Sequence, residues 1–310
     1  MKALIFTATY NEADNIESLI QEIKQYLPNQ TILVVDDASP DGTGRILDRL
    51  AEESEWVHVI HRPKKLGLGS AHKLAMKYAL LHEFDVLVTM DADFSHHPKY
   101  LPRLISELDH HDFVTGSRYA PGAVLGYGFI RSLISRTANI LARCLLGLPL
   151  KECTTSFRGF QRALLQRFPI DTIQSEGYSF FVESIFYISS LTNKVTEFPL
   201  YFEDRRAGTS KISKAEIGKG VLNLLRLFYL RVSSPFSNRL DEAMSSNSAQ
   251  KCSSCGSPYQ RTVPPSQIKK FPERTDIRLS LGQPTLQCLQ CGTIHGGEFA
   301  TGHPSTLKQS

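Results

Sequence analysis

One stretch, residues 86–98, decides the fold expected for this chain, and it reads VLVTMDADFSHHP. Its first five residues are apolar or β-prone, which is typical of a fully buried strand, and Asp91 and Asp93 follow where that strand must end. Ligands bind at the carboxyl ends of strands in α/β sheets, and paired carboxylates there suit a divalent cation held against an anionic substrate. We therefore predict Asp91 and Asp93 as metal ligands, with Ser95 as a further oxygen ligand. The alternative, a polar turn that only ends the strand, fits these residues equally well when they are taken alone.

The composition predicts a globular protein, and its mild charge argues against a dedicated nucleic-acid binder and suits an enzyme that handles phosphates. The 310 residues, of which 41% are hydrophobic, are enough for one large α/β domain and a small second one. The 35 basic and 31 acidic residues leave a mild net charge of +4. The first residues do not form a secretory leader, and no long apolar run is free of charge. We expect a cytoplasmic protein whose membrane contact, if it has one, is peripheral.

Strand and helix patterns alternate along the first half of the chain. Besides the strand before Asp91, apolar strand patterns occupy residues 3–7, 31–35, 57–60 and 113–116. This alternation predicts a largely parallel sheet with helices on both faces. The loop after the first strand lacks the glycine fingerprint of dinucleotide binding, which argues against a Rossmann oxidoreductase.

Two loops at predicted strand ends have the composition of nucleotide-binding loops. Asp36 and Asp37 follow the second strand, where a carboxylate can accept hydrogen bonds from a base or a ribose. Gly67 and Gly69 precede a predicted helix and let its backbone amides come close to a phosphate. Neither loop is specific by itself, and the second lacks the lysine and hydroxyl spacing of a P-loop.

These motifs, taken in order, resemble one known family. They are Thr9-Tyr10-Asn11-Glu12, Val34-Val35-Asp36-Asp37, Ser39-Pro40-Asp41-Gly42-Thr43, Gly67-Leu68-Gly69-Ser70-Ala71, Met90-Asp91-Ala92-Asp93 and Gly116-Ser117-Arg118-Tyr119. Thr154-Thr155-Ser156-Phe157-Arg158 and Gly177-Tyr178 continue the match further along. The set is similar to the family 2 glycosyltransferases of the dolichol-phosphate mannosyltransferase group, over about residues 1–232. The sequence departs from that pattern at Ala8, where proline is common, and at Glu152, where aspartate is frequent.

The resemblance implies a GT-A fold, a nucleotide-sugar donor and a polyprenyl-phosphate acceptor. The donor-binding residues that it implies are Tyr10, Glu12, Val35, Asp37, Asp91, Ala92, Asp93, Arg118, Arg205 and Lys211. Arg131 and Ser135 match acceptor-phosphate positions. Asp91, Asp93 and Arg205 form the implied catalytic group.

The expected activity is metal-dependent, inverting transfer of mannose from GDP-mannose to a polyprenyl phosphate. Mg²⁺ or Mn²⁺ would stabilise the departing nucleoside diphosphate, and arginines would meet phosphates with two parallel donors. An acceptor phosphate is already ionised near neutral pH, so no general base is assigned, although Glu183 is a candidate if the acceptor is a hydroxyl. Two alternatives remain: another donor such as UDP-glucose, and a non-catalytic regulator that binds a sugar nucleotide.

The remaining sequence predicts a membrane-facing helix and a small second domain. Residues 213–232 start with a capping box and combine apolar side chains with Lys219, Arg226 and Arg231, as in a helix at a membrane interface, although a core helix is equally compatible. We assign residues 1–232 to the glycosyltransferase domain, 233–250 to a linker, 251–300 to a zinc-ribbon-like domain and 301–310 to a disordered tail. The predicted structural Zn²⁺ ligands are Cys252, Cys255, Cys288 and Cys291. We expect the ribbon to contact a protein partner or the membrane, and not nucleic acid.

Overall fold

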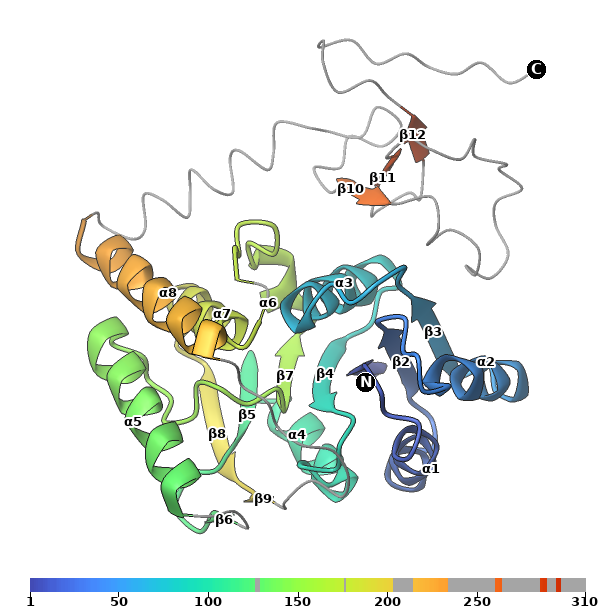
Figure 1. Cartoon of the computed structure of the whole chain (residues 1–310), viewed down its shortest axis with the longest axis horizontal. Coiled ribbons are helices and arrows are strands. Elements are labelled where there is room, and N and C mark those ends of the chain that lie inside the picture. The colour runs from blue at the N-terminus through green and yellow to red at the C-terminus, as the bar shows by residue number, and fades with distance from the viewer. Residues whose placement is uncertain are drawn as a thin grey trace. The chain divides into compact units, whose positions relative to one another are not determined.

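The computed structural model describes residues 1–125, 129–175, 177–202, 214–233, 260–263, 285–288 and 294–296. The chain divides into two compact units, Met1–Leu240 and Asp241–Ser310. In the larger unit, seven strands form one sheet in the order β3-β2-β1-β4-β7-β5-β8 (Figure 1). These strands are β1 (Ala3–Thr9), β2 (Thr31–Asp36), β3 (Val57–His61), β4 (Val86–Asp91), β5 (Phe113–Ser117), β7 (Arg158–Gln161) and β8 (Val195–Pro199). A separate parallel pair joins β6 (Val124–Leu125) and β9 (Tyr201–Phe202).

The sheet is largely parallel, as the alternating sequence pattern predicts. Strand β1 pairs in parallel with β2 and β4, β2 pairs in parallel with β3, and β5 pairs in parallel with β8. Only β7 among the seven runs antiparallel to its neighbours, β4 and β5. In the register, Ala8 of β1 lies between Val35 of β2 and Asp91 of β4. The segments that follow these three strands therefore leave the sheet at the same edge.

Helices cover both faces of the sheet. They are α1 (Ile16–Tyr26), α2 (Thr43–Glu53), α3 (Leu68–Leu81), the 3-10 helix η1 (Pro98–Tyr100), α4 (Leu101–Glu107), α5 (Phe129–Leu146), α6 (Arg162–Arg167), α7 (Ser179–Leu191) and α8 (Lys214–Ser233). On one face, Ile5 and alternate residues of β2 and β4 share a buried cluster with apolar residues of α1, α2 and α4. On the other face, the ring of Phe6 packs edge-on at 5.0 Å from the ring of His72 in α3. The period of two along β1 thus places successive side chains in two cores.

The predicted helix 213–232 is present as α8, which packs against α5 and α7 (Figure 1). The Arg231 guanidinium donates to the Leu145 carbonyl at 2.7 Å and joins the end of α8 to the end of α5. The Arg226 guanidinium pairs with Glu183 of α7 at 2.5 Å. Within the described residues, no helix is long and apolar enough to cross a bilayer.

The smaller unit contains a three-stranded antiparallel sheet in the order β10-β11-β12. Its strands are β10 (Gln260–Val263), β11 (Thr285–Cys288) and β12 (Ile294–Gly296). Cys252, Cys255 and Cys291 lie outside the described residues, and of Cys288 only the backbone is described. The zinc site therefore stays a prediction, as do the linker boundaries.

Candidate active site

The acid pair lies at the end of β4, as the sequence predicts. Asp93 is 5% exposed, and its Oδ1 atom accepts from the Ser95 backbone amide at 3.0 Å and from the Ser95 hydroxyl at 2.5 Å. Asp91 is more open, with one third of its side chain exposed. Phe94 has a left-handed φ of 61° while its ring is buried, so the turn between the acids and Ser95 is fixed by packing. Ser95 in this structure orients Asp93, and a hydroxyl oxygen next to a carboxylate still suits a cation.

His96 packs beside this turn. Its ring is 2% exposed and stacks on Phe157 with ring centroids 5.3 Å apart. Its Nε2 atom lies 3.0 Å from the Thr155 hydroxyl, and its Nδ1 atom lies 3.8 Å from the Asp91 carboxylate. The sequence pattern alone indicates no role for His96, because adjacent histidines before a proline are common in loops. The packing places it beside one of the two predicted metal ligands.

Asp91 and Asp93 are the carboxylates that the turn after β4 offers a cation, with the Ser95 hydroxyl beside Asp93. No group of three or more His, Cys, Asp or Glu side chains is arranged to hold a metal ion anywhere in the described ranges. A cation held by one or two carboxylates and by substrate phosphates is the usual arrangement for Mg²⁺. Asp91 and Asp93 therefore fit a metal that arrives with a diphosphate, and they do not fit a metal enclosed by protein ligands alone.

Asp36 builds the turn after β2. It accepts from the Thr9 hydroxyl at 2.9 Å, from the Ser39 amide at 3.1 Å and from the Ser39 hydroxyl at 2.5 Å. Burial by itself would raise the pKa of Asp36, but hydrogen bonds from His61, Ser39 and Thr9 outweigh it and lower the pKa to about 2. Asp36 is thus an ionised structural residue that ties the end of β1 to the loop after β2.

Asp37, the predicted nucleoside ligand, is 6% exposed and holds the β3–α3 loop. Its Oδ1 atom accepts from Nε of Arg62, and its Oδ2 atom accepts from the backbone amides of Leu66 at 3.1 Å and Gly67 at 3.3 Å. The predicted phosphate loop and the predicted nucleoside acid are therefore parts of one hydrogen-bonded unit. The sequence gives no sign of this role for Arg62, because nothing local links it to an acid 25 residues earlier.

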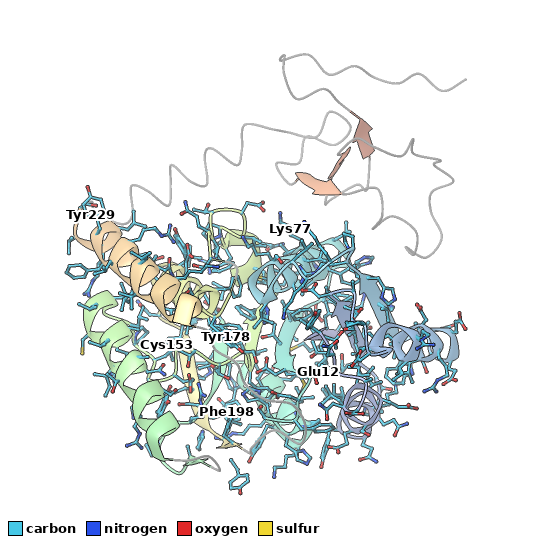
Figure 2. The ribbon with its side chains drawn as sticks, in the orientation of Figure 1. Glu12, Lys77, Cys153, Tyr178, Phe198 and Tyr229 are labelled. Carbon is cyan, nitrogen blue, oxygen red and sulfur yellow. The ribbon has the colours of Figure 1, made fainter. Side chains whose placement is uncertain are left out.

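The segment after β1 lies at the same edge of the sheet. Glu12 lies in this segment (Figure 2). Its amide donates to the Thr43 hydroxyl at 3.0 Å, and its carboxylate accepts from the Asn15 side chain at 2.9 Å. Tyr10 is 39% exposed, and its ring lies under the Lys65 ammonium at 3.9 Å. Val35 and Ala92 have buried side chains, so these two positions offer a ligand chiefly their backbone.

Arg118 lies at the end of β5 in a bidentate ion pair with Glu152. Its Nε and Nη2 atoms donate to the two Glu152 oxygens at 2.7 and 2.9 Å, and Nη2 also reaches the Thr154 hydroxyl at 2.8 Å. Glu152 is fully buried, which by itself would raise its pKa, but the Arg118 charge and hydrogen bonds, with those from Thr154, lower it. Ser135, a predicted acceptor residue, accepts from the Tyr119 hydroxyl at 2.6 Å.

Several predicted residues are not placed by the structure. Arg205 and Lys211 lie outside the described residues, and for Arg131 only the backbone in α5 is described. Glu183, considered as a base, is fully buried. It accepts from the amides of Gln174 and Ser175, from the Ser175 hydroxyl and from Arg226. Such a carboxylate holds α7, α8 and the segment before α7 together, which is a structural role.

Comparison with known proteins shows the family to which this chain belongs. Residues 4–168 match glycosyl transferase family 2. An undecaprenyl-phosphate mannosyltransferase of Micrococcus luteus is 38% identical over 227 residues, which are 73% of this chain and 93% of that protein. A polyprenol monophosphomannose synthase of Mycolicibacterium smegmatis is 36% identical over 226 residues, 72% of this chain and 85% of that protein.

The fold is also that of a solved nucleotide-sugar enzyme. Glucosyl-3-phosphoglycerate synthase from Mycobacterium tuberculosis, crystallised with Mn²⁺, UDP and glucosyl-3-phosphoglycerate, superposes with a TM-score of 0.55. The alignment covers 76% of this chain and 81% of that one at 18% identity, so it shows a shared fold and no more. With its mixed seven-stranded sheet, its acid pair after β4 and these matches, the chain belongs to glycosyl transferase family 2.

Proposed function

We propose that the protein transfers mannose from GDP-mannose to a polyprenyl (dolichyl-type) phosphate with inversion at the anomeric carbon. The observation that carries this proposal is the similarity, over most of both chains, to two proteins named for mannose transfer to undecaprenyl or polyprenol phosphate. The placement of Asp91 and Asp93 beside the segments after β1 and β2 is consistent with it. In the reaction, an oxygen of the acceptor phosphate forms the new bond to the sugar, and the bond to the nucleoside diphosphate breaks.

Asp91 and Asp93 would hold Mg²⁺ or Mn²⁺, which when bound supplies positive charge to the departing diphosphate. Ser95 keeps Asp93 in one orientation through two hydrogen bonds to the same oxygen. His96, packed on Phe157, keeps the Asp91 side of the turn in place. These contacts pre-organise the acids, so that binding does not have to order them.

The acceptor side needs positive charge and no general base. The phosphate nucleophile is already ionised near neutral pH, and Glu183 is enclosed by hydrogen-bond donors. We assign Arg118, Arg205 and Lys211 to donor phosphates, with Arg205 in the catalytic group, and Arg131 and Ser135 to the acceptor phosphate. Tyr10, Glu12, Val35, Asp37 and Ala92 complete the donor site in this proposal. These assignments follow the order of the family motifs.

An exposed apolar face on α8 supports a membrane-bound acceptor. Five of its apolar side chains are more than half exposed: Val221, Leu222, Leu225, Tyr229 and Val232. Four of them, from Leu222 to Val232, recur at the spacing of one helix face, and Tyr229 projects outward from α8 in Figure 2. Soluble monomers rarely expose such a stripe, whereas helices at a membrane interface do. We propose that α8 lies on the cytoplasmic face of a membrane, near the lipid acceptor.

The carboxy-terminal cysteine pairs are proposed to hold one structural Zn²⁺. Each pair has two residues between its thiols, and four thiolates in tetrahedral array are a common zinc site. Metal analysis of the purified chain should give about one Zn²⁺ per protein, and replacement of Cys255 by Ser should lower that content. Zinc-free wild-type protein would contradict the proposal.

A donor and acceptor panel tests the proposed function. Radiolabelled sugar transfer is measured from GDP-mannose and, in parallel, from UDP-glucose to a short polyprenyl phosphate, with Mg²⁺ or Mn²⁺ and with a chelator. The proposal predicts a lipid-soluble mannosyl product that requires metal. A glucosyl lipid and no mannosyl lipid would indicate the alternative donor. Tight nucleotide binding without any lipid product would favour the regulator.

A further inference from the structure

The β3–α3 loop, residues 62–67, is built onto the predicted nucleoside acid. Asp37 binds both ends of this loop, Arg62 through the side chain and Leu66 and Gly67 through the backbone. The backbone amide of Arg62 also donates to the Asp36 carbonyl at 2.8 Å. This loop is therefore joined to the end of β2, and in the proposed function it forms one wall of the donor site.

The Arg62 guanidinium also joins the loop to the first turn of α3. Its Nη1 atom donates to the Ser70 hydroxyl at 2.6 Å, and its Nη2 atom donates to the Gly67 carbonyl at 3.0 Å. The Ser70 hydroxyl in turn lies 2.8 Å from the same carbonyl. Arg62 is 4% exposed, so these contacts are sheltered from water. The loop is consequently held in one shape while the residues at its crest, Lys64 and Lys65, remain exposed.

Lys65 reaches from this crest to the segment after β1. Its ammonium lies 3.9 Å from the centroid of the Tyr10 ring. Arg62 and Arg118 are each paired with a carboxylate, Asp37 and Glu152. Lys65 has no such carboxylate partner among the described side chains, and an aromatic ring holds an exposed ammonium only weakly. A phosphate group binds an ammonium more strongly, because both partners are charged.

We propose that Lys65 is a nucleotide-binding residue whose ammonium leaves the Tyr10 ring and pairs with the diphosphate when a nucleoside-diphosphate sugar binds. The inference rests on the proposed function and adds a residue to it. The Arg62–Asp37 pair acts as the positioning device that keeps Lys65 within reach. The released ring face of Tyr10 becomes available to the base, so one movement serves both ends of the nucleotide.

Calorimetric titration with GDP and with guanosine, each in the presence of Mg²⁺, tests the inference. Lys65→Met should weaken GDP binding about tenfold and leave guanosine binding unweakened, because only GDP carries the diphosphate. The GDP affinity of Lys65→Met should also fall less steeply with added salt. Lys65→Arg should stay within about twofold of wild type, since it keeps the charge. Lys64→Met is the matched control on the same exposed crest and should bind GDP as wild type does.

Each other outcome has a definite meaning. Wild-type GDP affinity in Lys65→Met, an equal loss for guanosine and GDP, or an equal loss in Lys64→Met would each overturn the assignment of Lys65. If wild type binds UDP and not GDP, the same comparison with UDP and uridine decides it. If wild type binds neither nucleotide, the proposed function fails. This result is seen in the wild-type protein alone, so it is distinguishable from a failure of the Lys65 assignment, which is seen only in the variants.

Discussion

Replacement of Arg118 by Met tests whether the buried Glu152 carboxylate depends on one cation. Methionine keeps much of the apolar length of arginine and removes its charge and donors. Glu152 is fully buried and receives four hydrogen bonds, two from Arg118 and two from the amide and hydroxyl of Thr154. The variant keeps the Thr154 donors and loses the charge that compensates the carboxylate.

The expected loss of folding stability is large because the unpaired Glu152 carboxylate is buried and cannot be hydrated. Breaking a buried ion pair by removing one partner costs about 3–5 kcal/mol, and the two retained donors place this case near 3 kcal/mol. The pKa of Glu152 is lowered in the folded protein, so its contribution to stability is present above its unfolded pKa and is lost as the pH falls through the folded value. Without Arg118, burial raises that pKa instead, and protonation relieves the cost. The destabilisation of Arg118→Met should therefore be smaller at pH 5 than at pH 7.

Urea unfolding followed by circular dichroism at both pH values measures this difference. Arg49→Met is a suitable control, because Arg49 pairs with Glu17 at 2.8 Å on an exposed surface and its loss should leave the unfolding midpoint unchanged. The double variant Arg118→Met with Glu152→Gln should recover part of the lost stability, since the unpaired charge is gone. A loss below about 1 kcal/mol, or the same loss at both pH values, would refute the reasoning.

Three further changes probe the turn after β4, the core and α8. Ser95→Ala removes the hydroxyl that orients Asp93, so the transfer rate should fall about tenfold and the enzyme should need more Mg²⁺. An unchanged dependence of the rate on Mg²⁺ concentration would contradict this role of Ser95. Gly159→Ala places a methyl group against the Leu104 side chain and should lower the free energy of unfolding in urea by about 1–3 kcal/mol. An unchanged free energy of unfolding would show that the core can rearrange to accept the methyl group. Leu222→Ser with Leu225→Ser should reduce sedimentation with anionic vesicles; unaltered binding would argue against α8 as the membrane face.

The elements that sequence patterns predict well are those with strong periodicity. The strand expected at 31–35 is β2, Thr31–Asp36, and the helix expected at 213–232 is α8, Lys214–Ser233. The sequence also predicts the acid pair after β4, because a buried strand must end where carboxylates begin. Strand β7, only four residues long and antiparallel to both neighbours, was not predicted, because so short a segment carries no clear period.

The different structural roles of the site residues could not be predicted from local sequence. Asp36 and Asp37 are adjacent carboxylates, yet one ties β1 to the β2 turn and the other holds the β3–α3 loop through Arg62. The partner of Arg118 lies 34 residues away at Glu152. These roles come from tertiary contacts, and the sequence could at most mark the residues as charged and near strand ends.

The central claim is that the acids after β4 support metal-dependent sugar transfer to a lipid phosphate. The most direct measurement compares wild type, Asp93→Asn and the control Asp109→Asn for transfer of radiolabelled mannose from GDP-mannose to polyprenyl phosphate, over a series of Mg²⁺ concentrations and with chelator. Asp93→Asn keeps the size of the side chain and loses its charge. We predict metal-dependent product in wild type and in Asp109→Asn, and product reduced at least about a hundredfold in Asp93→Asn. Equal product and equal metal dependence in all three proteins would contradict the account.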